Sequence, residues 1–245
     1  FLVILLAVLP AAAEEEGPRT GYFRVHTTPL ELLGEDGARS LSGTFEPDEK
    51  LEWQLYVPTN YDPANPAGVI VFLTHRNSWG GSRREYNPAL EETNLIWAGV
   101  RGAGDDSPIN ERIMRLIMTP MLLARTYALD PERVYVGGFS GGAYVATIVA
   151  TGKPKLFKGG LFIGGAVVWG DELPTRIDEV RKNSYVFIAG SNDIALNTVR
   201  KAAIAFRDAG VERNELIVMP NQRQEMPGRK YLLDAIDFLD GKQSD

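Results

Sequence analysis

The chain has 245 residues, of which 44% are hydrophobic and 24% charged, and its net charge at pH 7 is −6. This length can bury a full core, and one domain over residues 14–245 is the simplest organisation. The acidic balance, without a run of Lys and Arg, argues against a nucleic-acid or anionic-membrane partner. The absence of cysteine excludes disulfides and thiolate zinc sites, and the two histidines lie far apart, so we expect no metal and no cofactor.

The N-terminal segment has the pattern of a secretory signal. An apolar run at Phe1–Pro10 is followed by small residues at Ala11–Ala13, as in an h-region and its cleavage site. A membrane span needs about 20 apolar residues, which is longer than this run. We therefore expect residues 1–13 to belong to a cleaved signal, the protein to be secreted or periplasmic, and the mature chain to have no integral membrane span.

The first predicted strands follow this segment. Gly21–Leu33 and Glu49–Val57 both carry β-forming residues, and Gly34–Arg39 supplies turn chemistry between them, which predicts an antiparallel pair. Pro58–Gly68 is typical of a loop. Val69–Leu73 is a short, continuous apolar run, as expected of a strand that is buried on both faces.

From this point strands and helices alternate along the chain. The pattern predicts further strands at residues 94–100, 133–136, 161–168, 185–189 and 215–219. It predicts a helix after Ser107-Pro108, with a kink or break at Pro120, and helices at residues 141–150, 173–181, 198–209 and 230–239. Such alternation indicates an α/β fold in which helices cover both faces of a mostly parallel sheet.

One serine stands at a predicted strand-to-helix turn. Gly138-Phe-Ser-Gly-Gly142 lies between a β-run and a helix, which is the G-x-S-x-G arrangement in its required context. The turn would hold Ser140 in a strained backbone conformation and expose its Oγ, while the flanking glycines avoid collisions. The Gly141 N–H at the start of the helix could stabilise an oxyanion. The alternative is a glycine-rich turn whose serine only caps a helix.

The segment Asp130–Ala146, DPERVYVGGFSGGAYVA, resembles the nucleophile segment of α/β-hydrolase esterases. It is most similar to the secreted polyhydroxyalkanoate-depolymerase and dienelactone-hydrolase-like group. The resemblance implies an α/β-hydrolase fold, a three-layer αβα sandwich, and a small-molecule ester or polyester as substrate. It also implies a catalytic order of serine, acid and histidine, with the acid after a late strand and the histidine in the loop after the last strand.

The resemblance implies Asp193 as the acid. Asp193 follows the predicted strand 185–189 in the run Gly190-Ser-Asn-Asp, where a carboxylate would orient an imidazole. An aspartate in such a loop also commonly caps the next helix. Asp171, after the preceding strand, is the second candidate.

The histidine position holds a glutamine. In the loop Met219–Pro227, Gln224 occupies the place where similar proteins carry the histidine. Its amide exchanges hydrogen bonds but has no basic site near neutral pH, so it cannot take the serine proton. The sequence therefore predicts an impaired serine-hydrolase-type carboxylic-ester hydrolase, or a non-catalytic ligand-binding protein on the same fold.

Few residues could replace the missing base. His26 lies in the lead-in segment, as an ordinary strand residue would. His75 follows the strand Val69–Leu73, where the resemblance implies the second oxyanion donor, in Thr74–Arg76; Arg76 replaces the glycine usual after this histidine. His75 would approach Ser140 from the wrong side for a base, and Glu225 is a weaker candidate.

Three tryptophans lie near predicted carboxyl ends of strands, where open α/β sheets bind ligands. Trp79, Trp97 and Trp169 either line an apolar pocket or belong to the core. The glycines of Gly99–Gly104 lack the Lys-Ser/Thr of a phosphate loop and are interpreted as a strand-to-helix turn.

Overall fold

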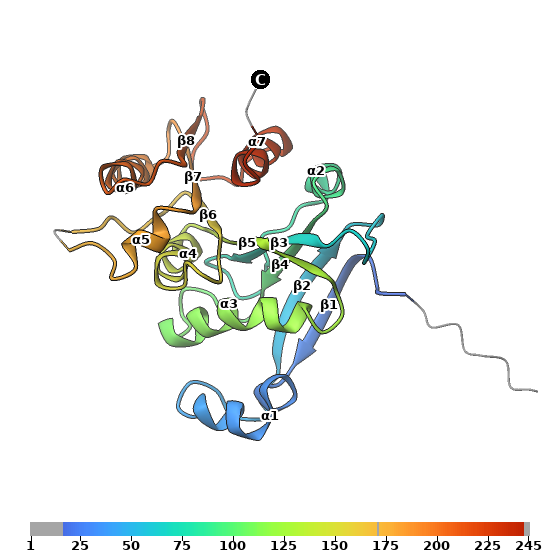
Figure 1. The fold of residues 1–245 in the computed structure, drawn as a ribbon. Helices are drawn as coiled ribbons and strands as arrows, with labels where there is room; N and C mark the ends of the chain where they lie inside the picture. The colour runs from blue at the N-terminus through green and yellow to red at the C-terminus, as the bar shows by residue number, and fades with distance from the viewer. Residues whose placement is uncertain (1–16, 171, 243–245) are drawn as a thin grey trace, which may run out of the picture.

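The computed structural model describes residues 17–170 and 172–242; the predicted signal (1–13) and Asp171 lie outside this range. Eight strands form one sheet in the order β1-β2-β4-β3-β5-β6-β7-β8 (Figure 1). The antiparallel pairings are β1 with β2 and β2 with β4, and the later pairings are parallel. The expected α/β architecture with a mostly parallel sheet is therefore confirmed.

The strands are β1 (Gly21–Thr27), β2 (Leu51–Val57), β3 (Ala67–Leu73), β4 (Leu95–Val100), β5 (Leu129–Phe139), β6 (Gly159–Ile163), β7 (Ser184–Gly190) and β8 (Asn214–Met219). The α-helices are α1 (Pro29–Ser40), α2 (Asn87–Glu92), α3 (Ile109–Leu123), α4 (Gly141–Gly152), α5 (Ile177–Val180), α6 (Leu196–Asp208) and α7 (Arg229–Leu239), and η1 (Arg84–Tyr86) is a 3₁₀ turn.

The sheet has a hydrophobic core on each face. α3, α4 and α6 cover one face of the sheet, and α2 and α7 cover the other (Figure 1). Their buried side chains belong to two separate hydrophobic clusters. Alternate residues of β3 enter the two cores, with Val69 and Val71 on one side and Ile70 and Phe72 on the other. A parallel strand covered on both faces needs apolar residues at every position, which explains its continuous apolar run.

The antiparallel pairing of β1 with β2 agrees with the prediction, but the segment between them does not. Residues 29–40 form α1 instead of a strand end and a turn, with a non-helical break at Gly34, whose φ is 71°. The helix begins with a capping box, in which Thr28 and Glu31 satisfy each other's backbone N–H groups. This local signal outweighs the β-propensity of the segment.

Three other predicted elements differ in extent. β6 ends at Ile163 because Gly164 turns the chain with a φ of 60°, so residues 164–168 are not a strand. The predicted helix 173–181 is reduced to Ile177–Val180, preceded by a turn in which Ile177 N–H donates to Pro174 O. α3 runs through Pro120 without a break and ends at Leu123. Proline lacks a backbone N–H and removes one helical hydrogen bond, but Pro120 lies in the last turn, so little helix follows it.

Across the two described stretches of the chain, no helix combines the length and the apolar character that a membrane crossing requires.

Candidate active site

Ser140 occupies the sharp turn between β5 and α4. Its φ of 54° and ψ of −123° lie in a region that residues with a side chain rarely adopt. The Ser140 N–H donates to Ile163 O of the neighbouring strand at 2.9 Å, which holds the turn against the carboxyl edge of the sheet. Ser140 does not cap the helix through its side chain, so the simple capping interpretation is not supported.

The glycines around Ser140 have a steric reason. A Cβ at Gly138 would lie 2.4 Å from the Gly142 carbonyl, and a Cβ at Gly142 would lie 2.1 Å from Leu73 O. Both separations are far below van der Waals contact, so only glycine fits at either position. The close approach of Leu73 also brings the end of β3 directly against the start of α4.

The first turn of α4 presents free N–H groups beside Ser140, because the first residues of a helix have no intrahelical acceptor. A carboxylate that the sequence did not single out lies beside them. A Cβ at Gly141 would be 2.0 Å from Asp105 Oδ1, so this oxygen lies within about 3.5 Å of Gly141 Cα. Arg112, which is buried, donates to the same oxygen at 2.9 Å. A fixed negative charge therefore stands next to the predicted oxyanion donor.

The loop after β3 is tied to the loop after β4. His75 O accepts from the Asp105 N–H at 3.1 Å, and Asn77 Oδ1 accepts from the Gly104 N–H at 2.6 Å. Within the predicted oxyanion segment, the Arg76 N–H donates to Thr74 Oγ1 at 3.1 Å. This bond engages one of the N–H groups that could have served as a second oxyanion donor.

Gln224 faces Ser140 from the loop after β8. Ser140 Oγ lies 3.5 Å from Gln224 Oε1, and Gln224 Nε2 donates to Gly164 O at 2.7 Å. Downstream, Pro227 O accepts from the buried Tyr86 hydroxyl at 2.7 Å and anchors the loop to η1. A neutral amide thus occupies the space in front of the serine.

Asp193 follows β7 and is buried, with 7% of its surface exposed. Its Oδ1 accepts from the Ala195 N–H at 2.7 Å, which helps to shape the entry into α6. Its Oδ2 is buried and has no hydrogen-bond partner among the described residues. Desolvating a carboxylate oxygen without a donor is costly, so a hydrogen-bond donor placed at this oxygen would stabilise Asp193.

Asp193 and Gln224 converge at Gly164. A Cβ built on Gly164 would lie 3.3 Å from Asp193 Oδ2 and 2.9 Å from Gln224 Cγ. The two loops are locked together, because Asn192 N–H donates to Gln222 O at 2.8 Å. The structure therefore brings Ser140, Asp193 and Gln224 together at one edge of the sheet.

The histidines have other surroundings. The ring of His75 packs 5.5 Å from the ring of Phe139, and its Nε2 accepts from Arg76 Nε at 3.1 Å. Its Nδ1 is buried and unpartnered within the described residues. His26 lies on β1 opposite Glu52, and Glu225 is exposed. No group of three potential metal ligands occurs among residues 17–170 and 172–242.

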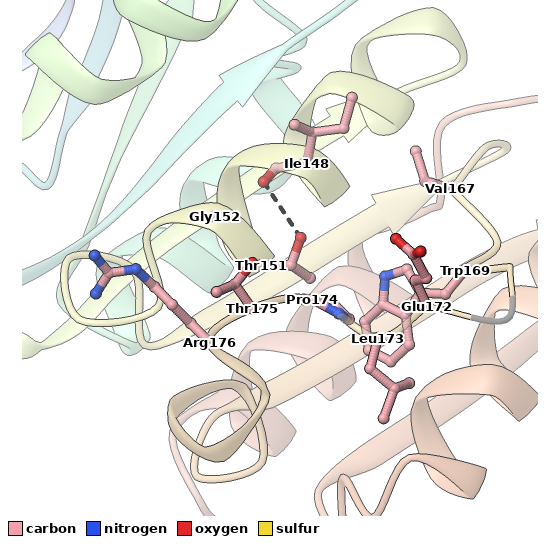
Figure 2. Close-up of a pocket in the computed structure, with 10 residues that line it drawn as sticks. All are labelled: Ile148, Thr151, Gly152, Val167, Trp169, Glu172, Leu173, Pro174, Thr175 and Arg176. Carbon is pink, nitrogen blue, oxygen red and sulfur yellow. Dashed lines mark hydrogen bonds between the residues drawn. The ribbon is translucent and has the colours of Figure 1, made fainter.

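The tryptophans divide between core and pocket. Trp97 is fully buried and donates to Gly80 O, so it belongs to the core, whereas Trp79 is partly buried beside Phe139. Trp169 lines a cavity of about 470 Å³ between α4 and the loop after β6 (Figure 2).

Asp105 lies beside the candidate site, and the sequence did not point to it. It lies in a Gly-rich turn whose only evident role was to connect a strand to a helix. The paired glycines after Ser140 signalled that something approaches closely, but the identity of that neighbour depends on how the loops after β3 and β4 fold together.

No protein-family model and no curated protein matches the chain in sequence. Solved structures do match it. The feruloyl esterase module from Clostridium thermocellum, a mutant complexed with sinapinate, has a TM-score of 0.66 at 12% identity, over 94% of this chain and 90% of that one. A ferulic acid esterase has a TM-score of 0.65 at 12% identity, over 90% and 99%.

A third structure, a candidate dienelactone hydrolase from Klebsiella pneumoniae, has a TM-score of 0.55 at 15% identity, over 84% of this chain and 88% of that one. These likenesses, together with the strand order, show that the chain has the α/β-hydrolase fold that its sequence suggested.

Proposed function

We propose that this chain of α/β-hydrolase fold is a serine-hydrolase-type carboxylic-ester hydrolase whose turnover is impaired by Gln224. The observation that carries the proposal is the contact between Ser140 Oγ and Gln224 Oε1 at 3.5 Å, beside the unpartnered Asp193 Oδ2. The fold neighbours are named as esterases and as a hydrolase, which favours a small-molecule ester or a polyester as substrate. Secretion or export to a periplasm remains part of the proposal, on the sequence pattern of residues 1–13.

In the proposed reaction, Ser140 Oγ attacks the ester carbonyl carbon and the carbonyl oxygen becomes an oxyanion at the Gly141 N–H. The strained turn holds Oγ ready for this attack. The Ser140 proton must pass to water, because an amide at position 224 cannot accept it. The tetrahedral intermediate then collapses with cleavage of the ester C–O bond, the alcohol leaves with a proton from water, and a second water hydrolyses the acyl-enzyme to the free acid and Ser140. Loss of a catalytic triad member typically lowers turnover by about 10⁴- to 10⁶-fold, so only residual hydrolysis is expected.

Gln224→His tests this proposal. An imidazole at this position could donate Nδ1–H to the vacant Asp193 Oδ2 and accept the Ser140 proton at Nε2. We expect a rise of about 10³-fold or more in the hydrolysis of short activated esters, together with covalent labelling of Ser140 by a fluorophosphonate. Ser140→Ala in the same background is the matched control and should abolish both signals.

The second candidate is a non-catalytic ligand-binding protein, favoured by the carboxylate of Asp105 beside Gly141. A resident negative charge opposes the formation of an oxyanion there. This candidate predicts ester binding without turnover, and no gain on Gln224→His. If Gln224→His neither hydrolyses esters nor labels with a fluorophosphonate while remaining folded, the hydrolase proposal is wrong and the binding protein stands.

A further inference from the structure

A second, smaller cavity lies where the C-terminal end of α3 meets β1 and β2 (Figure 1). Its volume is about 220 Å³, and its lining shares no described residue with the candidate active site. We propose that this cavity binds a small arylalkanoate, which is a carboxylate that carries one aromatic ring on a short chain. The ring would fill the cavity, and the carboxylate would pair with the exposed Arg19 in its lining.

The walls of the cavity are apolar and come from β1, β2, the last turn of α3 and the segment that follows it. The hydrophobic and aromatic lining residues are Phe23, Val25, Leu55, Leu122, Leu123 and Tyr127. All six pack in the hydrophobic core on this face of the sheet. The core therefore holds the walls in place before a ligand arrives, and they favour an apolar group over a polar one.

The size of the cavity limits the ligand. An apolar cavity of about 150 Å³ holds one benzene ring. A volume of about 220 Å³ leaves room for one ring and a short alkyl chain, but it is below the roughly 300 Å³ at which sites for drug-sized molecules begin. The volume therefore favours a ligand with a single ring over a lipid or a polymer segment.

Arg19 gives the cavity a positive charge. It is the charged residue of the lining, and its guanidinium carbon lies 4.4 Å from the centroid of the Phe23 ring. None of the ion pairs within residues 17–170 and 172–242 involves Arg19. A guanidinium that stacks on a ring keeps its N–H donors at its edge, in a fork that matches a carboxylate. This charge selects an anionic group on the ligand.

The main chain of Arg19 is fixed to the wall of the cavity. The Tyr127 hydroxyl donates to Arg19 O at 2.6 Å, and the Tyr127 ring packs edge to face on Tyr61 with 5.3 Å between ring centroids. These contacts tie the segment before β1 to the segment after α3. The cation and the apolar walls are therefore pre-organised together, which lowers the entropy cost of binding.

Calorimetric titration with 3-phenylpropanoate tests the site. We expect saturable binding with a dissociation constant of about 0.1–1 mM, as for other ligands of this size. Propanoate lacks the ring and should bind more than about tenfold more weakly, because it buries little apolar area. The neutral 3-phenylpropanamide should bind about three- to fivefold more weakly, since an ion pair with an exposed arginine contributes modestly.

Two variants locate the binding. Arg19→Gln should remove the preference for the carboxylate over the amide, and its exposed position favours a folded protein. Thr126→Trp, at an exposed lining residue, should fill the cavity and weaken both ligands more than about tenfold. Arg24→Gln is the matched control, because Arg24 is exposed on β1 and does not line the cavity, so both affinities should stay unchanged.

Three results would overturn the proposal. The first is a titration with 3-phenylpropanoate that shows no saturation up to about 10 mM. The second is an equal effect of Arg19→Gln and Arg24→Gln on the preference for the carboxylate. The third is binding that Thr126→Trp leaves unchanged while the variant is folded by thermal denaturation, because the ligand would then lie elsewhere on the protein.

Discussion

Asp105 controls the electrostatics of the predicted oxyanion site at the scale of a single residue. Its Oδ1 lies beside Gly141 and accepts from Arg112 Nη2 at 2.9 Å, and the Asp105 side chain is 54% exposed. In the Gln224→His background, Asp105→Asn should raise turnover by about five- to tenfold, as expected from removing a like charge several ångströms from an oxyanion. Steady-state kinetics on a neutral short ester measures this.

Asparagine keeps an oxygen that can still accept from Arg112, so Asp105→Asn should remain folded. Asp106→Asn removes the same charge one residue away, where the carboxylate accepts from the Asn77 amide, and serves as the control. Equal effects of the two variants would mean that only the overall charge of the loop matters.

Ser140 also stores backbone strain. With φ at 54° and ψ at −123°, its conformation costs about 1–3 kcal/mol for a residue with a side chain, and glycine avoids this cost. Glycine also loses more conformational entropy on folding, which offsets part of this gain. Ser140→Gly should therefore raise the free energy of unfolding by about 0.5–1 kcal/mol. Urea denaturation checks this. Ser140→Ala retains the strain and should show no such gain.

At the scale of elements, Glu91 joins α2 to the end of β2. Burial raises the pKa of this carboxyl, but hydrogen bonds from the Thr59 N–H, the Tyr56 hydroxyl and the Thr59 hydroxyl outweigh burial, so its pKa is lowered from 4.5. A carboxyl with a lowered pKa in the folded state stabilises the protein above its unfolded pKa. This contribution is lost as the pH falls through the folded pKa.

Glu91→Gln should therefore flatten the fall in the free energy of unfolding below about pH 4.5. Urea denaturation between about pH 3 and pH 7 measures how the free energy of unfolding changes with pH. Glu92→Gln, at the exposed neighbouring residue, is the control. A slope that is unchanged in Glu91→Gln would show that other carboxyls dominate the acid transition.

The elements also show where local pattern was sufficient. The apolar runs of β3 and β7 predicted buried strands, and both strands are buried at every position because helices cover both faces of the sheet. The prediction for residues 29–40 was wrong, because it followed the β-forming residues of this segment and did not consider the capping box of Thr28 and Glu31. The prediction of a helix over residues 173–176 was also wrong. This segment lines a cavity, and the helix begins only at Ile177.

At the scale of the whole molecule, the C-terminal end of α7 is clamped to β5. Arg133 Nε and Nη2 donate to the two oxygens of Asp240 at 2.9 and 2.7 Å, and the Tyr135 hydroxyl donates to Oδ1 at 2.8 Å. The Asp240 side chain is 7% exposed, whereas that of Arg133 is 21% exposed. Breaking this pair leaves a partly desolvated guanidinium and a phenol without a full acceptor.

Asp240→Asn should lower the free energy of unfolding by about 2–3 kcal/mol, below the range for a fully buried pair because Arg133 retains some solvent. Asp237→Asn is the control, since Asp237 pairs with Lys242 at the surface and should matter by less than about 1 kcal/mol. Thermal or urea denaturation measures both. A loss in Asp240→Asn no larger than that of the control would refute the clamp.

The sequence by itself determined the sheet, because strands buried on both faces must be apolar throughout and such runs are visible without a structure. It also singled out Ser140 by the glycines on each side of it, and it identified Gln224 as a residue without a basic site, which is a property of the side chain alone. The convergence of Asp193 and Gln224 at Gly164, the carboxylate of Asp105 beside Gly141 and the cavity along α4 were decided only by the tertiary structure. Each joins loops that are distant in the chain, and the packing of such loops has no period or spacing that a sequence can display.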